Sequence, residues 1–496
     1  MKRLFNLLGI GIVSLWLVMI GLLVKKLHVK EERAPTDSRS LAGTIDSPQR
    51  EWKEIYLKNK KVGYTVSHIK PFDGGYFVQE EVFLRLNLMG SASGVYTATQ
   101  CRTDHSFYLK SFKFSMTSGV VRFNLSGRVE GDELLLETGR GKGKRAQRIR
   151  LSAPPMLGAC VGYFLKSRKI RIGEEFKVPI FDPSTTAQKE AVVKVVASEP
   201  VTINNIRYKA YRLETEMWGK QLTSWVDESG TTLKETGFMG FTIVKSSAAA
   251  APRDIDGEGE VDFYEAASIS VEGRLPEPTR VNYLKLQVEG IGNAALDPDV
   301  LTGGRQRFHE GVMEVSREDL PSEASYALPY TDHGDGMKRF LKPEFNIESD
   351  EKEIIEKARE ISGSEKNPLL VSRRLSTWVY HHLDKRPVVS VPSALEVLKT
   401  GVGDCNEHAT LLTALLRASG IPARLSIGLV NTREKFFYHA WTEAYVGKWV
   451  SMDATLNQMP VDATHIKLVE GNLERQVEIA GLIGKIKLKV LDYRYD

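Results

Sequence analysis

The sequence predicts an α+β protein in which antiparallel β-rich domains precede a core of mixed helices and strands. From residue 51 to about residue 245, short segments rich in β-branched and aromatic residues alternate with polar ones, and glycine, aspartate and asparagine separate them. This texture is typical of antiparallel strands. After residue 349 apolar residues recur at helical spacing, and two aromatic-rich, strand-like segments follow at 436–455. Helices are therefore expected mainly in the last part of the chain.

The chain is long enough for several domains, because a domain usually holds about 100 to 200 residues and this chain has 496. Its 42% hydrophobic and 26% charged residues are ordinary values for globular proteins. Changes of composition place the boundaries. The expected segments are a transmembrane helix at 4–24, a linker at 31–50, a β-rich N-terminal domain at 51–245, a small β-rich module at 260–345, a core at 349–470 and a C-terminal extension at 471–496.

An almost unbroken apolar run, LFNLLGIGIVSLWLVMIGLLV, occupies residues 4–24. About 20 such residues cross a bilayer as a helix. A cleaved signal peptide is the alternative, but the run exceeds the usual apolar segment of about 7 to 15 residues, and no small-x-small cleavage site follows before Lys25. We therefore expect a single-pass N-terminal anchor followed by a polar linker.

Three helices can be located in the region that precedes the aromatic-rich strands. A helix is expected at 351–361, where the apolar residues share one face. Asn367 and Pro368 make a cap and a first position for a second helix. Ser393 and Glu396 form a capping box for a third. These helices would form one lobe of the core and the later strands the opposing lobe.

Cys405 is the cysteine whose surroundings place it at the start of a helix. A tight turn through Gly401 and Gly403 precedes it, an apolar run follows it, and Gly420 with Pro422 supplies a helix stop. The free N–H groups and the dipole at a helix start stabilise a thiolate, which makes the cysteine a better nucleophile. A free cysteine can also be a small buried hydrophobic residue, so this position alone does not decide its role.

A hairpin downstream brings an imidazole beside a carboxylate. The two strand-like segments flank a turn centred on Gly447. If the chain reverses there, His439 lies opposite a position within a residue or two of Asp453. A helix-start thiol, an imidazole and a carboxylate are the three parts of an activated cysteine nucleophile. The candidate catalytic residues are therefore Cys405, His439 and Asp453.

At these residues the chain resembles the transglutaminase-like superfamily, whose core has a papain-like α+β fold and a Cys-His-Asp triad. The resemblance covers roughly residues 350–470 and rests on blocks in the expected order: GVGDCNEHA followed by ALLRASGIPAR, then YHAW, then KWVSMDAT. It is closest to bacterial proteins. It implies that Cys405 is the nucleophile, His439 the general base and acid, and Asp453 the group that orients the imidazole.

The resemblance implies thiol acyl transfer on amide bonds of proteins or peptides. An amine acceptor would give an isopeptide cross-link, as in a protein-glutamine transferase, and water would give hydrolysis, as in a cysteine protease or amidase. The residues do not choose between these outcomes. The alternative from another class is a non-catalytic envelope binding or scaffolding protein with the same fold. Such a protein would be expected to lack one member of the triad, whereas Cys405, His439 and Asp453 are all present.

The basic residues around the apolar run bear on its orientation. Lys2 and Arg3 precede the run, whereas Lys25, Lys26 and two further basic residues follow it, which would leave the large domain in the cytoplasm. We nevertheless expect the catalytic domain outside, because such a span on a short basic tail commonly acts as a signal-anchor and similar anchored members of the superfamily are usually extracytoplasmic. The expected partners are the membrane and a protein or peptide substrate, including cell-envelope material.

No cofactor, metal or nucleic acid is expected. A net charge of +5 is small for this length and does not argue for nucleic acid. His408, His439 and Asp453 could be imagined as a zinc set, but structural zinc sites generally contain more sulfur, and no calcium loop is visible. His408 and His465 are interpreted as structural histidines.

The three cysteines cannot all pair with one another. Cys101 and Cys160 both lie in the β-rich N-terminal domain, so a bridge between them is one alternative in an oxidising compartment. Three free thiols are the other. In either case the reactive thiol is expected to be Cys405.

Overall fold

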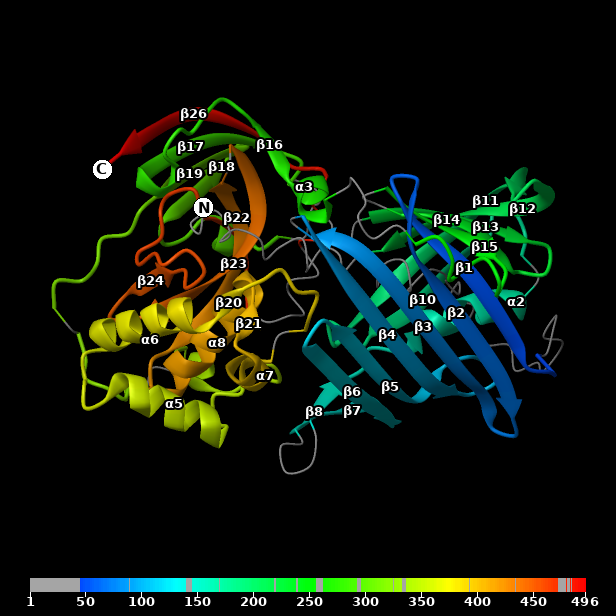
Figure 1. Ribbon diagram of the computed structural model, residues 1–496, viewed down its shortest axis with the longest axis horizontal. Helices are drawn as coiled ribbons and strands as arrows, with labels where there is room; N and C mark the ends of the chain where they lie inside the picture. Colours follow the sequence, from blue (N-terminus) through cyan, green and yellow to red (C-terminus); the bar gives the residue numbers. More distant parts are fainter. Residues whose placement is uncertain are drawn as a thin grey trace. The chain divides into compact units, whose positions relative to one another are not determined.

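The computed structural model describes residues 45–496, apart from gaps at 89, 140–144, 169, 218–219, 238–239, 256–261, 292–295, 324, 332–335, 392, 433, 472–478, 480–481 and 483. The described residues form two compact units that meet in sequence between Asp262 and Phe263 (Figure 1). The predicted span at 4–24 and most of the predicted linker lie outside the described residues. Among the residues that are described, no helix has the length and apolarity to cross a membrane.

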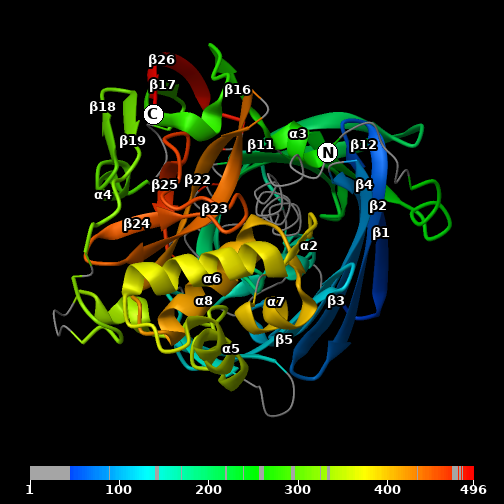
Figure 2. The ribbon, with the colours of Figure 1, turned by 60° about the vertical axis from the view of Figure 1, so that its left-hand side comes forward.

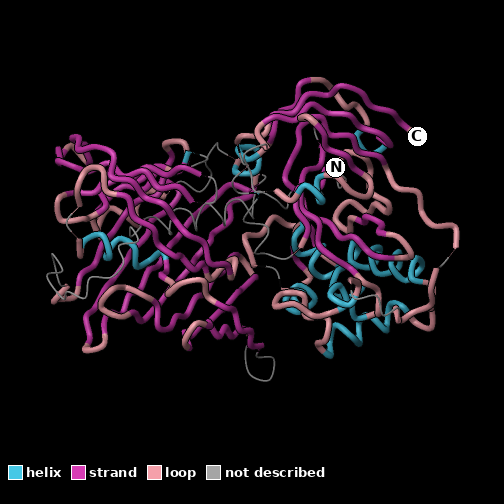
Figure 3. Tube along the Cα trace, turned by 180° about the vertical axis from the view of Figure 1, so that it is seen from behind, coloured by secondary structure: helices cyan, strands magenta, loops and turns pink. Residues whose placement is uncertain are grey.

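The N-terminal unit is built around a 15-stranded sheet, whose strands run in the order β8 to β1 and then β15 to β9. Strands β1 and β15 pair antiparallel and so join two runs of consecutive strands. Strands make up most of the trace of this unit (Figure 3). The elements are β1 (Gln49–Leu57), β2 (Lys60–Phe72), β3 (Gly75–Leu88), β4 (Ser91–Thr103), β5 (Leu109–Ser118), β6 (Val121–Glu130), β7 (Glu133–Thr138), β8 (Arg145–Arg150), β9 (Met156–Leu157), α2 (Gly158–Lys166), β10 (Glu175–Asp182), β11 (Ala187–Ile203), β12 (Ile206–Met217), β13 (Lys220–Asp227), β14 (Thr232–Thr236) and β15 (Phe241–Ser246).

Alternating burial explains why these residues form strands. Along β4, every second residue from Val95 to Thr103 is buried, whereas the residues between them are exposed or partly exposed. One face of a pleated strand therefore lies on the core and the other on solvent. The helix α2 buries Val161 and Leu165 in that core. The N-terminal unit is thus β-rich, as the sequence predicts.

Two cysteines meet inside this unit. Cys101 lies on β4 and Cys160 on α2, and both are buried. Their Sγ atoms are 3.2 Å apart and are free thiols in the structure. The pair suggested by the sequence therefore has its two thiols in contact, without a bond between them.

The C-terminal unit contains a 9-stranded sheet in the order β18-β19-β17-β26-β16-β23-β22-β25, with β24 paired to β23. A further pair of short strands, β20 and β21, lies beside the helices (Figure 1). The strands are β16 (Ile269–Glu272), β17 (Val281–Glu289), β18 (Gln306–His309), β19 (Val312–Ser316), β20 (Asp384–Lys385), β21 (Val402–Gly403), β22 (Ala423–Thr432), β23 (Lys435–Tyr445), β24 (Trp449–Met452), β25 (Ile466–Glu470) and β26 (Lys487–Tyr495).

The segments predicted as a small module at 260–345 and an extension at 471–496 contribute strands to this same sheet. The last strand, β26, pairs antiparallel with β17 and parallel with β16. In turn, β16 pairs with β23 of the core. Strands that are distant in sequence thus form hydrogen bonds with one another. The alternation of apolar and polar residues within one strand does not reveal such long-range pairing. From Phe263 onward, the described parts of both segments belong to the C-terminal unit.

The helices of this unit pack together against the sheet, with α8 between the other helices and β23 (Figure 2). The long helices are α5 (Lys352–Ser362), α6 (Pro368–His382), α7 (Ala394–Thr400) and α8 (Cys405–Ala418). Shorter helical turns are α3 (Phe263–Ala267), η4 (Pro278–Arg280), α4 (Pro298–Leu301) and η5 (Lys338–Leu341).

The sequence-predicted caps explain where these helices begin. The Asn367 side chain accepts hydrogen bonds from Leu369 N and Leu370 N at the start of α6, and the Ser393 side chain caps α7. Helix α8 is buried on every face, since all residues from Cys405 to Arg417 are buried. Each fully buried leucine is worth roughly 1.5 to 3 kcal/mol relative to an exposed one, so α8 is the central element of this lobe.

Candidate active site

The start of α8 is fixed by a reciprocal cap. Asp404 is the cap residue, and its Oδ1 accepts from Asn406 N at 3.1 Å, while Glu407 Oε2 accepts from Asp404 N at 2.9 Å. Such a capping box satisfies donors that a helix start otherwise leaves free. Cys405 is therefore the first residue of α8, as the sequence predicts.

Two glycines shape the turn that delivers Cys405. Gly401 ends α7 with a left-handed φ of 63°, which glycine adopts without strain. A Cβ atom at Gly403 would lie 2.2 Å from the Glu407 Cβ, so only glycine fits against the capping box. The tight turn is thus a consequence of the same residues that cap the helix.

The Cys405 side chain is fully buried. Its Sγ atom accepts a hydrogen bond of 3.3 Å from Ala440 N on β23. Burial, and then the charge of Asp404, raise the pKa of the Cys405 thiol well above its ordinary value, although the Ala440 N–H opposes them. The predicted stabilisation of the thiolate by the helix start is therefore outweighed, and the thiol needs a base to lose its proton.

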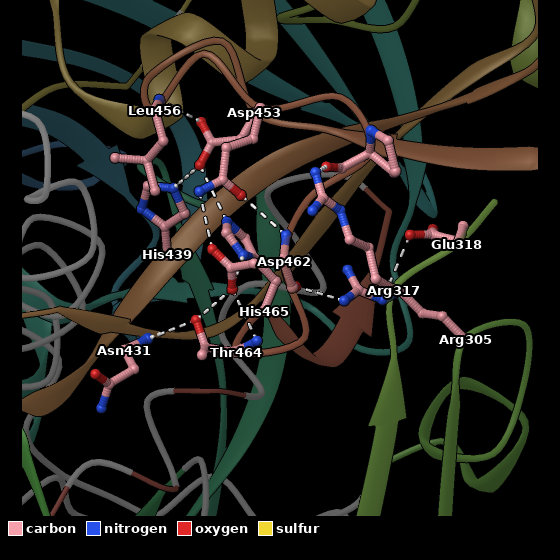
Figure 4. A network of polar contacts seen from close by, with 12 residues as sticks. Arg305, Arg317, Glu318, Asn431, His439, Asp453, Leu456, Asp462, Thr464 and His465 are labelled. Carbon is pink, nitrogen blue, oxygen red and sulfur yellow. Dashed lines mark hydrogen bonds and ion pairs between the residues drawn. The ribbon is translucent and has the colours of Figure 1, made fainter. Parts of the chain in front are cut away.

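His439 lies on β23 beside Ala440, and its ring faces Asp453, just after β24. Pairs such as Thr442 with Met452 set the register of this hairpin, as the sequence predicts. The His439 Nε2 atom is 2.6 Å from Asp453 Oδ2, and both side chains are buried (Figure 4). The imidazole and the carboxylate are thus hydrogen-bonded neighbours.

Asp453 is held as an anion. Its Oδ1 accepts from Thr455 N at 2.7 Å and from Leu456 N at 3.1 Å. Burial alone would raise the pKa of Asp453, but the charges and hydrogen bonds of His439 and His465 hold that pKa well below its usual range. The carboxylate can therefore accept the His439 Nε2–H, which leaves Nδ1 with the free lone pair. Among the described residues, this Nδ1 atom has no hydrogen-bond partner.

His465 is the residue of this network that sequence reasoning missed. It is fully buried, and its Nε2 atom lies 3.2 Å from the same Asp453 Oδ2 that His439 contacts. Its Nδ1 atom lies 3.3 Å from Asp462 Oδ1. The only signal for it in the sequence is an Asp-x-x-His spacing shortly before a strand, which has no specific chemical meaning by itself.

His439, Asp453 and His465 also have the donor types of a metal site, and their ligand atoms lie within 4.8 Å of one another. Two ligands about 2.0 to 2.1 Å from a tetrahedral ion are about 3.3 Å apart. The 2.6 Å between His439 Nε2 and Asp453 Oδ2 is shorter and fits a shared proton instead. The geometry thus favours a hydrogen-bonded chain over a metal centre.

His408, which the sequence places one helical turn after Cys405, packs inside the helical lobe. Its Nδ1 atom is 2.6 Å from the Asp404 carbonyl oxygen. Burial lowers the pKa of His408 to about 4, so the ring is neutral at physiological pH. Its described contacts fit the predicted helix-packing role.

Comparison with known families agrees with this fold. Residues 355–454 match the family model of the transglutaminase-like superfamily. The C-terminal unit therefore contains a transglutaminase-like domain, as the resemblance implies. The matched stretch includes Cys405, His439 and Asp453.

Several solved structures are partly similar to this chain. One is a protein named as a candidate cysteine protease from Cytophaga hutchinsonii, with 18% sequence identity and a TM-score of 0.29. The match covers 44% of this chain and 86% of that chain. Another is a β-barrel-like protein of a domain of unknown function from Brucella abortus, at 12% identity and a TM-score of 0.32, with 40% and 95% covered. A candidate protease from Parabacteroides distasonis has 12% identity and a TM-score of 0.21, with 77% and 70% covered. No curated protein matches the sequence.

Proposed function

We propose that the C-terminal unit is a thiol acyl-transfer enzyme that acts on amide bonds of proteins or peptides through Cys405, His439 and Asp453. One observation carries the proposal: the Cys405 sulfur is hydrogen-bonded to the N–H of Ala440, the residue next to His439, while His439 is hydrogen-bonded to a buried carboxylate. Thiol, imidazole and carboxylate thus follow in the order that nucleophilic catalysis requires.

Each residue has a definite task in this proposal. His439 Nδ1 takes the proton of the Cys405 thiol, and the sulfur attacks the amide carbonyl. The C–N bond breaks as His439 returns the proton to the leaving amine, and a thioester remains on Cys405. An amine or water, deprotonated by His439, then displaces the sulfur. Asp453 orients the imidazole and stabilises its charged form.

The burial of Cys405 adds a condition to this proposal. A fully buried sulfur reaches an amide only when neighbouring segments move apart, as in enzymes whose loops open for substrate. The raised pKa of the thiol also means that reactivity depends on His439 rather than on the helix start. A non-catalytic scaffold would show no such dependence.

Alkylation of the three cysteines separates the enzyme from the scaffold. In protein first treated with a reductant, iodoacetamide should alkylate Cys405 at least about 100-fold faster than Cys101 and Cys160, because the proposal gives Cys405 a base, His439. All three thiols are buried, so the other two are internal controls for access. Peptide mass spectrometry over time measures the three rates.

The control variant for this measurement is His439→Ala, in which the Cys405 rate should fall to that of the other two cysteines. Equal rates in the unmodified protein, or a Cys405 rate unchanged in His439→Ala, would favour the scaffold. Trapping of an acyl-enzyme from cell-envelope material would then identify the substrate.

We also propose that residues 4–24 anchor the protein in a membrane, with the catalytic domain outside and cell-envelope proteins or peptides as its substrates. The cysteine pair reports on that compartment. Outside the cytoplasm an oxidant or disulfide donor can remove two electrons and two protons from Cys101 and Cys160, whose sulfurs are 3.2 Å apart. Protein isolated from cells without reductant should then show one titratable thiol after denaturation. Three titratable thiols would contradict the bridge and the oxidising location.

A further inference from the structure

His465 lies between two carboxylates, outside the proposed triad but in contact with it. Its Nε2 atom is 3.2 Å from Asp453 Oδ2, and its Nδ1 atom is 3.3 Å from Asp462 Oδ1 (Figure 4). Carboxylate oxygens are acceptors only, so a ring that faces one at each nitrogen is best satisfied when both nitrogens carry a proton. The geometry therefore fits the imidazolium form of His465.

Asp462 is a fixed support for that imidazolium. Its Oδ1 accepts from Thr464 N at 2.8 Å, and its Oδ2 accepts from Gln458 Nε2 at 2.8 Å. Arg305, from the segment before β18, donates to the Asp462 carbonyl oxygen. Because the Asp462 carboxylate is held from several sides, it can hold the His465 ring against Asp453.

The charges around His465 agree with this geometry. Burial alone would lower the pKa of His465, but the two carboxylates outweigh burial and raise it to about 9. The pKa of Asp462 is in turn held below its ordinary value, despite burial, by His465. Three side chains of the network, Asp453, Asp462 and His465, thus carry charge at neutral pH.

Other charged groups approach the network from neighbouring elements. The His439 ring on β23 has its centroid 5.8 Å from that of His465. Lys385 on β20 interacts electrostatically with Asp453. Arg305 is balanced by Glu318, with 3.6 Å between them. His465 is therefore a charged group in direct contact with the same Asp453 oxygen that His439 contacts.

We propose that His465 is a positioning residue for the acyl-transfer reaction. Supported by Asp462, the His465 imidazolium fixes the Asp453 carboxylate and offsets part of its negative charge. Asp453 then orients His439 without locking the His439 ring in its charged form. This inference rests on the proposed function of Cys405 and His439. If Asp453 acted on His439 alone, its full negative charge would favour protons on the thiol and on the imidazole. His465 shares that charge and so sets the pH above which the thiol-imidazole pair becomes reactive.

The test is the pH dependence of Cys405 alkylation by iodoacetamide in the full chain and in His465→Gln. Glutamine can still donate a hydrogen bond to Asp453 but has no charge. Removing a positive charge about 6 Å from the His439 ring should move the rise of the alkylation rate to higher pH by about one to two pH units. The exposed residue His309 gives the matched control, and His309→Gln should leave the profile unchanged.

His465→Ala separates hydrogen bonding from charge. It should show the same shift and in addition a lower maximum rate, which His465→Gln should largely restore. A purely structural role predicts instead a lower melting temperature with no displacement of the profile. A folded His465→Gln protein whose profile coincides with that of the unmodified chain would overturn the inference.

A measurement on the unmodified chain keeps the proposal testable even if the variants fail to fold. Hydrogen–deuterium exchange at the C2 position of each histidine, followed by mass spectrometry against pH, gives its titration midpoint. His465 should titrate well above the ordinary histidine value of about 6.5. A midpoint at or below that value would overturn the proposal.

The outcomes also distinguish this inference from the proposed function. If His439→Ala leaves the alkylation profile of Cys405 unchanged, the proposed function fails. If His439→Ala alters the profile and His465→Gln does not, the proposed function stands and only the role of His465 is wrong.

Discussion

Cys405→Ala is expected to abolish acyl transfer while the chain still folds. Loss of the nucleophile from a triad typically lowers kcat by roughly 10⁴-fold or more. The structural cost is small, because alanine removes one buried sulfur atom and leaves the Ala440 N–H without its acceptor, a loss of about 1 to 3 kcal/mol. The readout is mass spectrometry of cell-envelope proteins and peptides after incubation with the enzyme, in search of new isopeptide bonds, hydrolysed amides and an acyl-enzyme.

Cys405→Ser is the matched control for folding in that experiment. Its hydroxyl can still accept from Ala440 N, so it should melt like the unmodified protein and yet be as inactive as the alanine variant. Substantial turnover by a folded Cys405→Ala protein would end the proposal for the nucleophile.

The same assay tests the other two members of the proposed triad. His439→Ala should be comparably severe, and Asp453→Asn should fold but lose about 10⁴-fold in kcat, because an amide no longer selects the tautomer with the proton on Nε2. Asp319→Asn, at an exposed carboxylate of the same unit, is the control for the change of charge and should retain full activity.

Local sequence signals were sufficient to predict the parts of the site that local chemistry determines. The turn through Gly401 and Gly403 before an apolar run predicted the start of α8 at Cys405, and the structure adds the capping box of Asp404 and Glu407. The glycine at the hairpin turn fixed the register that places His439 near Asp453. The order of sequence blocks then gave the transglutaminase-like domain that the family comparison supports.

What could not be predicted depends on contacts between distant segments. Nothing in the residues near Val281 indicates that β17 pairs with β26 at the end of the chain. The burial of Cys405, which raises the pKa of its thiol, depends on how α8 and β23 pack. His465 was interpreted as structural because Asp453, which precedes it by 12 residues, becomes its neighbour only in the folded chain. Tertiary packing thus changed the electrostatics of residues whose identities were already known.

Gly428→Ala is expected to destabilise the C-terminal unit strongly and to disrupt the site with it. Gly428 lies on β22, opposite His439 on one side and Lys467 of β25 on the other. A Cβ atom there would lie 1.8 Å from the Ile466 carbonyl oxygen and 3.0 Å from Leu468 N. Both are backbone atoms of a paired strand, so the clash cannot be relieved by rotating a side chain.

Because β25 must shift, overpacking at Gly428 should cost about 3 kcal/mol or more. For a unit of this size each kcal/mol lowers the melting temperature by roughly 2 to 4 °C, so its calorimetric transition should fall by about 6 to 12 °C. Gly336→Ala is the matched control, since a Cβ atom at Gly336 meets nothing within 4 Å.

The shift of β25 would also displace His465, the residue directly before Ile466. The pH profile of Cys405 alkylation in any folded Gly428→Ala protein should therefore move toward the profile of His465→Ala. A Gly428→Ala protein with the melting temperature of the control would show that β25 does not pack against β22 as the structure has it.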